Sequence, residues 1–387
     1  MRGALSLPKL CGFLFFATYL LHYGPLARKS FPAFGQAMFW FSAYAAIFLL
    51  HGWLVDEPWL SSFLVRGFTI VQLLILFWTG ADLLRDAAVN RGALRSYLAA
   101  SLFLAVGVIF HLPGFEAELD AGRVTGLGDN PNEVAQHMAV ALIILIGLYV
   151  DKRRKRLRTS TYLIGAALPL AMLLVLTGSR GGVLAFVGGC LLYLMPRWRS
   201  QRTATTIMAA AIGIIAVLYM SASNEYVSAR WQQAYYEGSL SGREEILPAA
   251  VGMIAEEPLF GWHPVNWFYE LGRRTGHPEG KDAHNLVLAL LLEVGILGAI
   301  PFFVGYGLCF RAAWKARGGP LGMMPAALLS TVLAAGMSGT TLTWKTQWWV
   351  LSLALAMASL ARRQSFSCRA AGLMPRARFL HRVSRAC

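Results

Sequence analysis

The feature that most constrains this chain is a series of long apolar runs, each close to the length of a membrane-spanning helix. A helix needs about 20 mostly apolar residues to cross the hydrocarbon core of a bilayer. Only 14% of the 387 residues are charged, whereas a soluble domain carries about 25%, so there is too little charge to cover a soluble surface. The sequence therefore predicts an all-α polytopic membrane protein.

Eleven such runs are visible, and each is predicted to be a spanning helix: 8–24, 35–54, 62–80, 95–112, 131–150, 160–177, 181–196, 203–221, 284–310, 321–338 and 345–361. The run at 284–310 is long enough to be kinked or tilted. The chain then divides into four parts: spans one to eight (1–221), one large loop (222–283), the C-terminal spans (284–361) and a basic tail (362–387). An odd number of spans places the N-terminus outside, whereas its basic residues favour the inside, so a twelfth helix or an irregular start is expected.

The charged connectors indicate the orientation. The basic ones are Asp151–Ser160, Arg197–Arg202 and Arg311–Arg317, and they fall on the same side as the tail, which the positive-inside rule makes cytoplasmic. The opposite connectors are acidic or neutral and include the 222–283 loop. We therefore expect a multi-pass inner-membrane protein whose large loop lies on the non-cytoplasmic side. The net charge of +15 is explained by these connectors and by a tail that binds anionic lipid headgroups, so nucleic acid is not an expected partner.

Other chemistries lack their sequence signals. The five cysteines are scattered, without a CxxC pair or a histidine at ligand spacing, so neither a disulfide framework nor a zinc site is predicted. There is no P-loop pattern and no large cytoplasmic domain, so no nucleotide is expected. The apolar start lacks a clear cleavage site and is interpreted as the first span rather than as a signal peptide.

The loop is too long to be a mere connector and carries helical patterning. Apolar residues recur at three- and four-residue spacing through Glu244–Glu256, with Gly242 before them and Pro258 after them. This pattern predicts a short amphipathic helix that lies on the membrane. An aromatic turn is predicted to follow it at Gly261–Tyr269.

Three residues are the strongest candidates for chemistry. Arg180 lies in a glycine-rich turn between two spans, Arg243 opens the loop helix, and His284 lies where the loop re-enters the membrane. The predicted topology puts all three near the outer headgroup level. Two arginines offer planar donors suited to a phosphate group, and histidine is suited to act as a general base near neutral pH.

Each candidate also has a plainer interpretation. Arg180 can snorkel at a helix end, Arg243 can pair with a neighbouring glutamate, and His284 can cap a helix at the interface. Their coincidence on one side of the membrane favours the functional interpretation. On the same side, Asn132 follows a proline at a helix start, where it either belongs to the cap or lines the mouth of a cavity. His137 and Glu293 lie deeper; both are ionisable groups within spans, and their roles stay open.

Several segments of the sequence resemble those of a known family, the O-antigen ligase and polymerase-like superfamily of bacterial envelope glycosyltransferases. The order and spacing of several segments carry the resemblance across roughly residues 130–300: Asn130–Ala135, Leu176–Gly182, Ser241–Arg243, Glu257–Gly261, Ala283–Leu288 and Glu293–Gly298. The first hundred residues are similar only as hydrophobic helices.

The resemblance implies a GT-C-like fold of about 11–12 spans in the bacterial inner membrane, with the active site facing the periplasm. It also implies a transferase that takes a glycan from undecaprenyl diphosphate and passes it to a sugar hydroxyl of the lipid A–core oligosaccharide. In that reaction Arg180 and Arg243 are expected to hold the donor diphosphate, and His284 to deprotonate the acceptor hydroxyl, with inversion at the anomeric carbon. Asn132, Ser179 and Asn285 complete the expected substrate-binding set. No D-x-D motif accompanies these segments, so a metal-independent reaction is predicted, with no cofactor.

Three alternatives remain. An O-antigen polymerase or an O-linked protein oligosaccharyltransferase shares the same segments and differs only in the acceptor. A membrane transporter belongs to a different class, and polytopic bundles with charges in the membrane are often transporters. No inverted repeat is visible in the sequence, and the long loop has no evident role in transport.

Overall fold

The computed structural model covers residues 1–387 and describes residues 7–23, 32–115, 118–120, 123–126, 130–149, 157–195, 242–319 and 321–370, with a few positions between 213 and 236. Within these ranges ten of the eleven predicted spans are helices, and the span expected at 203–221 lies almost entirely outside them. The all-α polytopic fold is therefore confirmed.

The long helices follow the apolar runs closely. They are α1 (Leu7–Tyr23), α2 (Pro32–Leu50), α3 (Leu60–Leu83), α4 (Ala87–Ile109), α5 (Pro131–Tyr149), α6 (Leu157–Leu176), α7 (Arg180–Leu194), α12 (Leu286–Lys315), α13 (Met324–Gly336) and α14 (Lys345–Ala370). Among the described residues, five segments are long and apolar enough to cross a membrane by length and composition alone: Ala33–Leu54, Glu57–Leu83, Ala87–Ile109, Pro131–Leu148 and Leu286–Gly318.

Shorter elements connect these helices. They are the 3₁₀ turns η1 (His51–Leu54), η2 (Glu57–Trp59) and η5 (Ala316–Gly318), the strands β1 (Glu118–Asp120) and β2 (Arg123–Thr125), and the loop helices α10 (Arg243–Glu256) and α11 (Asn266–Arg274). The two strands form an antiparallel ribbon between α4 and α5, with Asp120 opposite Arg123.

The last helix is longer than the sequence predicts. α14 continues to Ala370, nine residues past the expected end of the span at 361. The apolar run ends near 361, but the first glycine or proline after the start of α14 is Gly372, so nothing in the sequence stops the helix earlier. The part of the basic tail beyond 370 lies outside the described residues.

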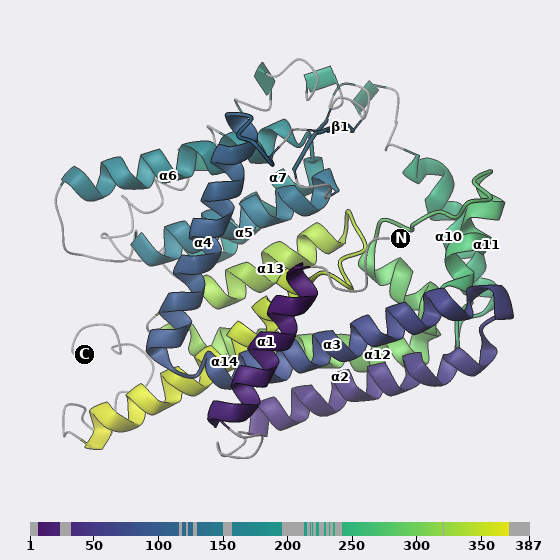
Figure 1. Ribbon diagram of the computed structural model, residues 1–387, viewed down its shortest axis with the longest axis horizontal. Helices are drawn as coiled ribbons and strands as arrows, with labels where there is room; N and C mark the ends of the chain where they lie inside the picture. The colour runs from purple at the N-terminus through teal and green to yellow at the C-terminus, as the bar shows by residue number, and fades with distance from the viewer. Residues whose placement is uncertain are drawn as a thin grey trace.

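The helices pack in two connected groups (Figure 1). α2 and α12 pack together, and α14 contacts both α3 and α12. Their shared core is aromatic: the fully buried ring of Phe41 lies 5.0 Å from Phe77, 5.7 Å from Phe302 and 5.1 Å from Trp348, centroid to centroid. α13 joins this group to the second one, which contains α5, α6 and α7.

The long helix α12 is interrupted, so of the kink or tilt expected from its length the kink is found and can be placed. Gly295 has φ 60° and ψ −168°, a conformation that is essentially restricted to glycine, and it divides the helix into 286–294 and 296–315. The second part has 20 residues, enough to cross about 30 Å of hydrocarbon. The first part, 286–294, is therefore not needed for the membrane crossing. It packs instead against the loop helices α10 and α11, with which it forms a cap at one end of the bundle.

The loop chain fills the interruption. The N–H groups of Ile296 and Leu297, which have no helical acceptor at the break, donate to the carbonyls of Pro258 (2.9 Å) and Leu259 (3.2 Å). Gly261, with φ 71°, lies directly against the broken backbone, and a Cβ there would lie 2.7 Å from the amide nitrogen of Gly295. We call residues 258–261 the plug segment. Its carbonyl groups fix this part of the loop to the backbone of α12.

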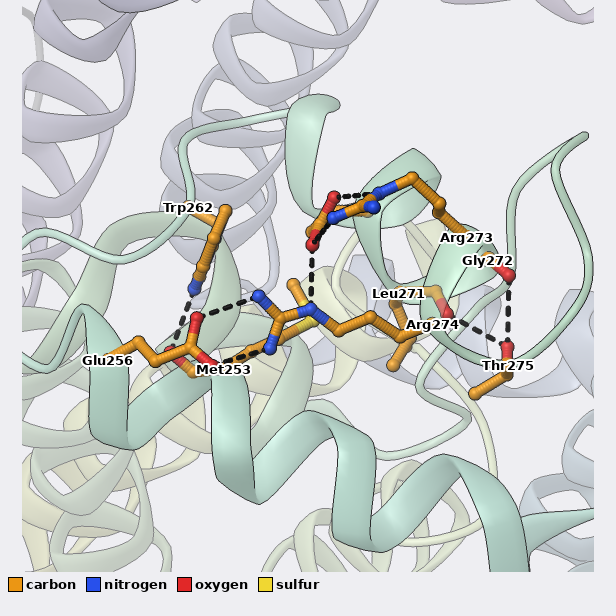
Figure 2. A network of polar contacts seen from close by, with 9 residues as sticks. Met253, Glu256, Trp262, Leu271, Gly272, Arg273, Arg274 and Thr275 are labelled. Atoms are coloured by element: carbon orange, nitrogen blue, oxygen red, sulfur yellow. Dashed lines mark hydrogen bonds and ion pairs between the residues drawn. The ribbon is translucent and has the colours of Figure 1, made fainter.

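α10 and α11 lie together at one end of the bundle (Figure 1), where they share a small second core with the first part of α12. A polar clasp joins the ends of the two helices (Figure 2). Arg274 of α11 makes two hydrogen bonds of 2.7 Å to Glu256 of α10 and one of 2.6 Å to Glu270, and its guanidinium lies 4.9 Å from the ring centre of Trp262.

The predicted loop helix is confirmed, whereas the predicted aromatic turn is wrong over its second half. α11 already begins at Asn266, so the last residues of Gly261–Tyr269 are helical. Trp267 and Leu271 face the second core while Glu270 and Arg274 face the clasp, which is an amphipathic helical pattern. The helical pattern was not recognised in the sequence because its aromatic residues are also typical of a membrane interface.

Candidate functional site

The segments singled out in the sequence meet at one turn of the structure. Residues 337–340, between α13 and α14, contact three of them through short polar or close-packed contacts. We call this segment the α13–α14 turn. This turn was not among the residues predicted from the sequence; its signal there is the small polar stretch Ser338–Thr341 between the last two spans.

The first contact comes from the turn that carries Arg180. Arg180 is the first residue of α7, and Ser179 caps the helix by accepting a hydrogen bond from the N–H of Gly182 (3.2 Å). Gly181 packs so tightly against Ser338 that a Cβ at Gly181 would overlap the serine hydroxyl. Glycine is therefore required at this position, and the contact places the base of the Arg180 side chain beside the α13–α14 turn.

Arg243 reaches the same turn from the loop. Gly242, the N-cap residue of α10, has φ 80°, a left-handed conformation that glycine adopts readily. The helix starts at the next residue, Arg243. The Nη2 group of Arg243 donates a 2.7 Å hydrogen bond to the carbonyl of Ser338. This bond joins the first residue of α10 to the α13–α14 turn of the helix bundle.

His284 is held by a third set of contacts. Its backbone N–H donates to Oδ1 of Asp282 (2.7 Å), and the hydroxyl of Thr340 donates to the same oxygen. His284 has φ 47°, an uncommon conformation for a residue with a side chain, and it is half-buried. The next residue, Asn285, caps α12 by accepting from the N–H groups of Val287 and Leu288, and its amide donates to the carbonyl of Met337 (3.4 Å).

The surroundings of His284 favour its neutral form. Burial lowers the pKa of the imidazole below its ordinary value of 6.5, and the positive charges of Arg243, Lys281 and Arg123 lower it further, while Asp282 acts in the opposite direction. A neutral imidazole at pH 7 can accept a proton, which a general base must do.

Asn132 and Ser179 form a linked pair on the other side of Arg180. The Ser179 hydroxyl donates to Oδ1 of Asn132 (2.8 Å), and the Nη2 group of Arg123 donates to the same oxygen (2.8 Å). Arg123 comes from the β-ribbon and was missed in the sequence analysis. Its only sequence signal is a lone basic residue in an otherwise acidic connector.

Glu293 and His137 lie outside this arrangement. The fully buried carboxylate of Glu293, two residues before the interruption of α12, is 2.7 Å from Nη2 of Arg66 on α3. The Nδ1 atom of His137 lies 2.9 Å from the hydroxyl of Tyr97 and 3.1 Å from that of Thr346. Both residues thus join neighbouring helices: Glu293 links α12 to α3, and His137 links α5 to α4 and α14.

The positive charges around His284 come from Arg243, Lys281 and Arg123. In the described part of the chain, no three histidine, cysteine, aspartate or glutamate side chains gather closely enough to hold a metal ion. The arrangement thus combines guanidinium groups, which bind oxyanions well, with one imidazole that is biased toward its neutral form.

Two comparisons with known proteins bear on this arrangement. The model of the O-antigen ligase family matches residues 165–303, a range that contains Arg180, Arg243 and His284. A relative named O-antigen ligase, from Pseudomonas aeruginosa strain PAO1, is 25% identical over 301 residues, covering 77% of this chain and 69% of the relative. The resemblance inferred from the sequence segments is therefore confirmed.

Proposed function

Because residues 165–303 match the model of the O-antigen ligase family, we propose that this membrane protein transfers a polysaccharide from undecaprenyl diphosphate to a sugar hydroxyl of lipid A–core oligosaccharide. The observation that carries the proposal is the common anchoring of three segments on the α13–α14 turn. Through it, the Arg180 turn, Arg243 and the His284 segment, which are far apart in the sequence, are held at one place.

The two arginines are assigned to the donor. When the glycosidic bond breaks, the electron pair stays with the leaving diphosphate, whose negative charge grows during the reaction. Guanidinium groups that are already in place stabilise this charge without reorganising solvent, so the reaction needs no metal ion in this proposal. Asn132, Ser179 and Asn285 frame the donor site, because their hydrogen bonds hold the segments beside Arg180 and His284.

His284 is assigned to the acceptor. Its neutral imidazole takes the proton of the acceptor hydroxyl while the hydroxyl oxygen attacks the anomeric carbon of the donor sugar. The new carbon–oxygen bond forms opposite the bond that breaks, so the configuration of that carbon is inverted. The donor bond supplies the driving force, and no nucleotide or cofactor is required.

The location follows from the same assignment. A diphosphate on a lipid lies at the headgroup level, so the site must lie at a membrane surface, and the acidic connectors favour the periplasmic surface of the inner membrane. In this proposal the site is a cavity covered by α10 and α11, with the helix bundle as its floor.

Lipopolysaccharide from cells that carry His284→Ala tests the proposal directly. The variant is expected to leave lipid A–core without O-antigen on a gel, because the attacking hydroxyl keeps its proton. His277→Ala is the matched control, since this half-exposed loop histidine contacts Glu279 and Lys281 rather than the α13–α14 turn. Full-length O-antigen at the normal level in His284→Ala cells would overturn the assignment of the base.

The arginine assignment is tested by lysine replacement. Arg180→Lys and Arg243→Lys keep the charge but lose the planar pair of donors, so ligation is expected to fall strongly in both. Arg273→Lys on α11 is the control, because this side chain is exposed and pairs with Glu270 on its own helix. Normal ligation by Arg180→Lys would count against bidentate diphosphate binding.

A further inference from the structure

Arg123 occupies a position that the proposed function does not yet use. It opens β2 of the ribbon between α4 and α5, and β2 packs against α5 and α6. Its guanidinium makes two directed hydrogen bonds: Nε donates to the carbonyl of Thr177 (2.9 Å) and Nη2 donates to Oδ1 of Asn132 (2.8 Å). One side chain thus joins the start of α5 to the turn that precedes Arg180.

These two bonds belong to a continuous network. The Asn132 oxygen that accepts from Arg123 also accepts from the Ser179 hydroxyl, and that hydroxyl caps α7, whose first residue is Arg180. The backbone of the Arg180 turn is therefore held from both sides, by Arg123 at Thr177 and by Ser338 at Gly181. A displaced turn would carry Arg180 with it.

We propose that Arg123 is a third arginine of the transfer site, a positioning residue that locks Asn132 and the Thr177–Gly182 turn into one unit and adds its positive charge to that of Arg180 and Arg243. The proposal rests on the function proposed above. The Arg123 side chain has two separable effects. Its two hydrogen bonds, to Thr177 and Asn132, require the planar guanidinium group, whereas its electrostatic effect on His284 requires only a positive charge.

The positive charge of Arg123 has a measurable electrostatic effect on His284. The charged groups that act on its imidazole are Asp282, Arg243, Lys281 and Arg123. The positive charge of Arg123 holds the pKa of His284 down, so removing that charge raises this pKa. Because the neutral imidazole is the active base, the acidic limb of the rate profile then moves to higher pH.

The test measures the pH profile of glycan transfer by purified full-length protein in lipid. The donor probe is undecaprenyl-diphosphate-linked glycan, and the acceptor is lipid A–core. Arg123→Lys keeps the charge and loses the fork, so its plateau rate is expected to fall roughly tenfold or more while its acidic limb stays in place. Arg123→Gln loses both, so its plateau falls and its limb moves to higher pH.

Two controls isolate each effect. Lys281→Gln removes a positive charge near His284 without breaking the Thr177 and Asn132 contacts, so its limb moves to higher pH while its plateau stays near that of the wild type. Arg91→Gln makes the same replacement as Arg123→Gln on the exposed face of α4 and is expected to leave both quantities unchanged.

The outcomes separate this proposal from the proposed function. If the wild-type protein transfers no glycan, the proposed function fails. If the wild type is active and Arg123→Lys matches its plateau, the positioning role is wrong. If the limb of Arg123→Gln stays in place while that of Lys281→Gln moves, the charge role is wrong. If Arg123→Gln fails to fold, the plateau of Arg123→Lys decides the positioning role alone.

Discussion

Gly295→Ala is the substitution that tests the architecture of the cap most sharply. Gly295 interrupts α12 in a conformation that side chains avoid, and a Cβ at this position would overlap the carbonyl of Leu259 in the plug segment. The added methyl group must push the plug segment away or force the helix to straighten. Either change separates the loop helices from the part of α12 that begins beside His284.

The magnitude follows from the contacts that are lost. The backbone conformation costs a residue with a side chain about 1–3 kcal/mol. Displacing the plug segment removes the hydrogen bonds from the N–H groups of Ile296 and Leu297, worth about 0.5–1.5 kcal/mol each. Together these terms lower the free energy of unfolding by about 2–6 kcal/mol. Gly261→Ala acts on the same contact, so the two losses should not add in the double variant.

Unfolding by titration with a denaturing detergent, in micelles, measures this loss. Gly188→Ala on α7 is the matched control, because a Cβ there meets no atom within 4 Å, and its stability should stay within about 1 kcal/mol of the wild type. A Gly295→Ala protein that unfolds at the wild-type midpoint would refute the backbone contact between the plug segment and α12.

Three further predictions follow from the other contacts. Arg66→Ala leaves the buried Glu293 carboxylate without its ion-pair partner and should lower the free energy of unfolding by about 3 kcal/mol, measured by the same titration; a double change of both residues to apolar ones should recover much of the loss. Arg274→Ala opens the clasp between α10 and α11, so limited proteolysis should cut the loop faster, whereas unchanged cleavage would contradict the clasp. Asp282→Asn removes the negative charge that raises the pKa of His284, so the acidic limb of transfer should move to lower pH; a limb that moves upward would contradict this sign.

The apolar runs predicted the helices well because the bilayer imposes a length and a composition that are visible in one dimension. The interruption of α12 could be expected only as a kink or a tilt of a long helix. Placing it at Gly295 required the plug segment, whose partners lie more than thirty residues earlier in the chain. α11 was concealed for a different reason: its nine residues are too few for a clear helical period, and its aromatic residues suit an interface equally well.

The candidate site was predicted in part. The arginine and histidine segments stood out because glycine neighbours or helix starts surround them, and the structure brings all three to the α13–α14 turn. That turn and Arg123 were missed because their importance lies in contacts with distant residues: Ser338 accepts from Arg243, and Arg123 donates to Thr177. Neither contact has a spacing that a single sequence can reveal.

The central claim is that this protein itself transfers a lipid-linked glycan through the site around His284. The most direct measurement mixes purified protein in lipid with undecaprenyl-diphosphate-linked glycan and lipid A–core, without ATP and with a chelator of divalent metals. The account predicts glycan attached to lipid A–core with the wild-type protein and none with His284→Ala. Equal transfer by the two proteins, or transfer that appears only when ATP or a metal ion is added, would contradict it.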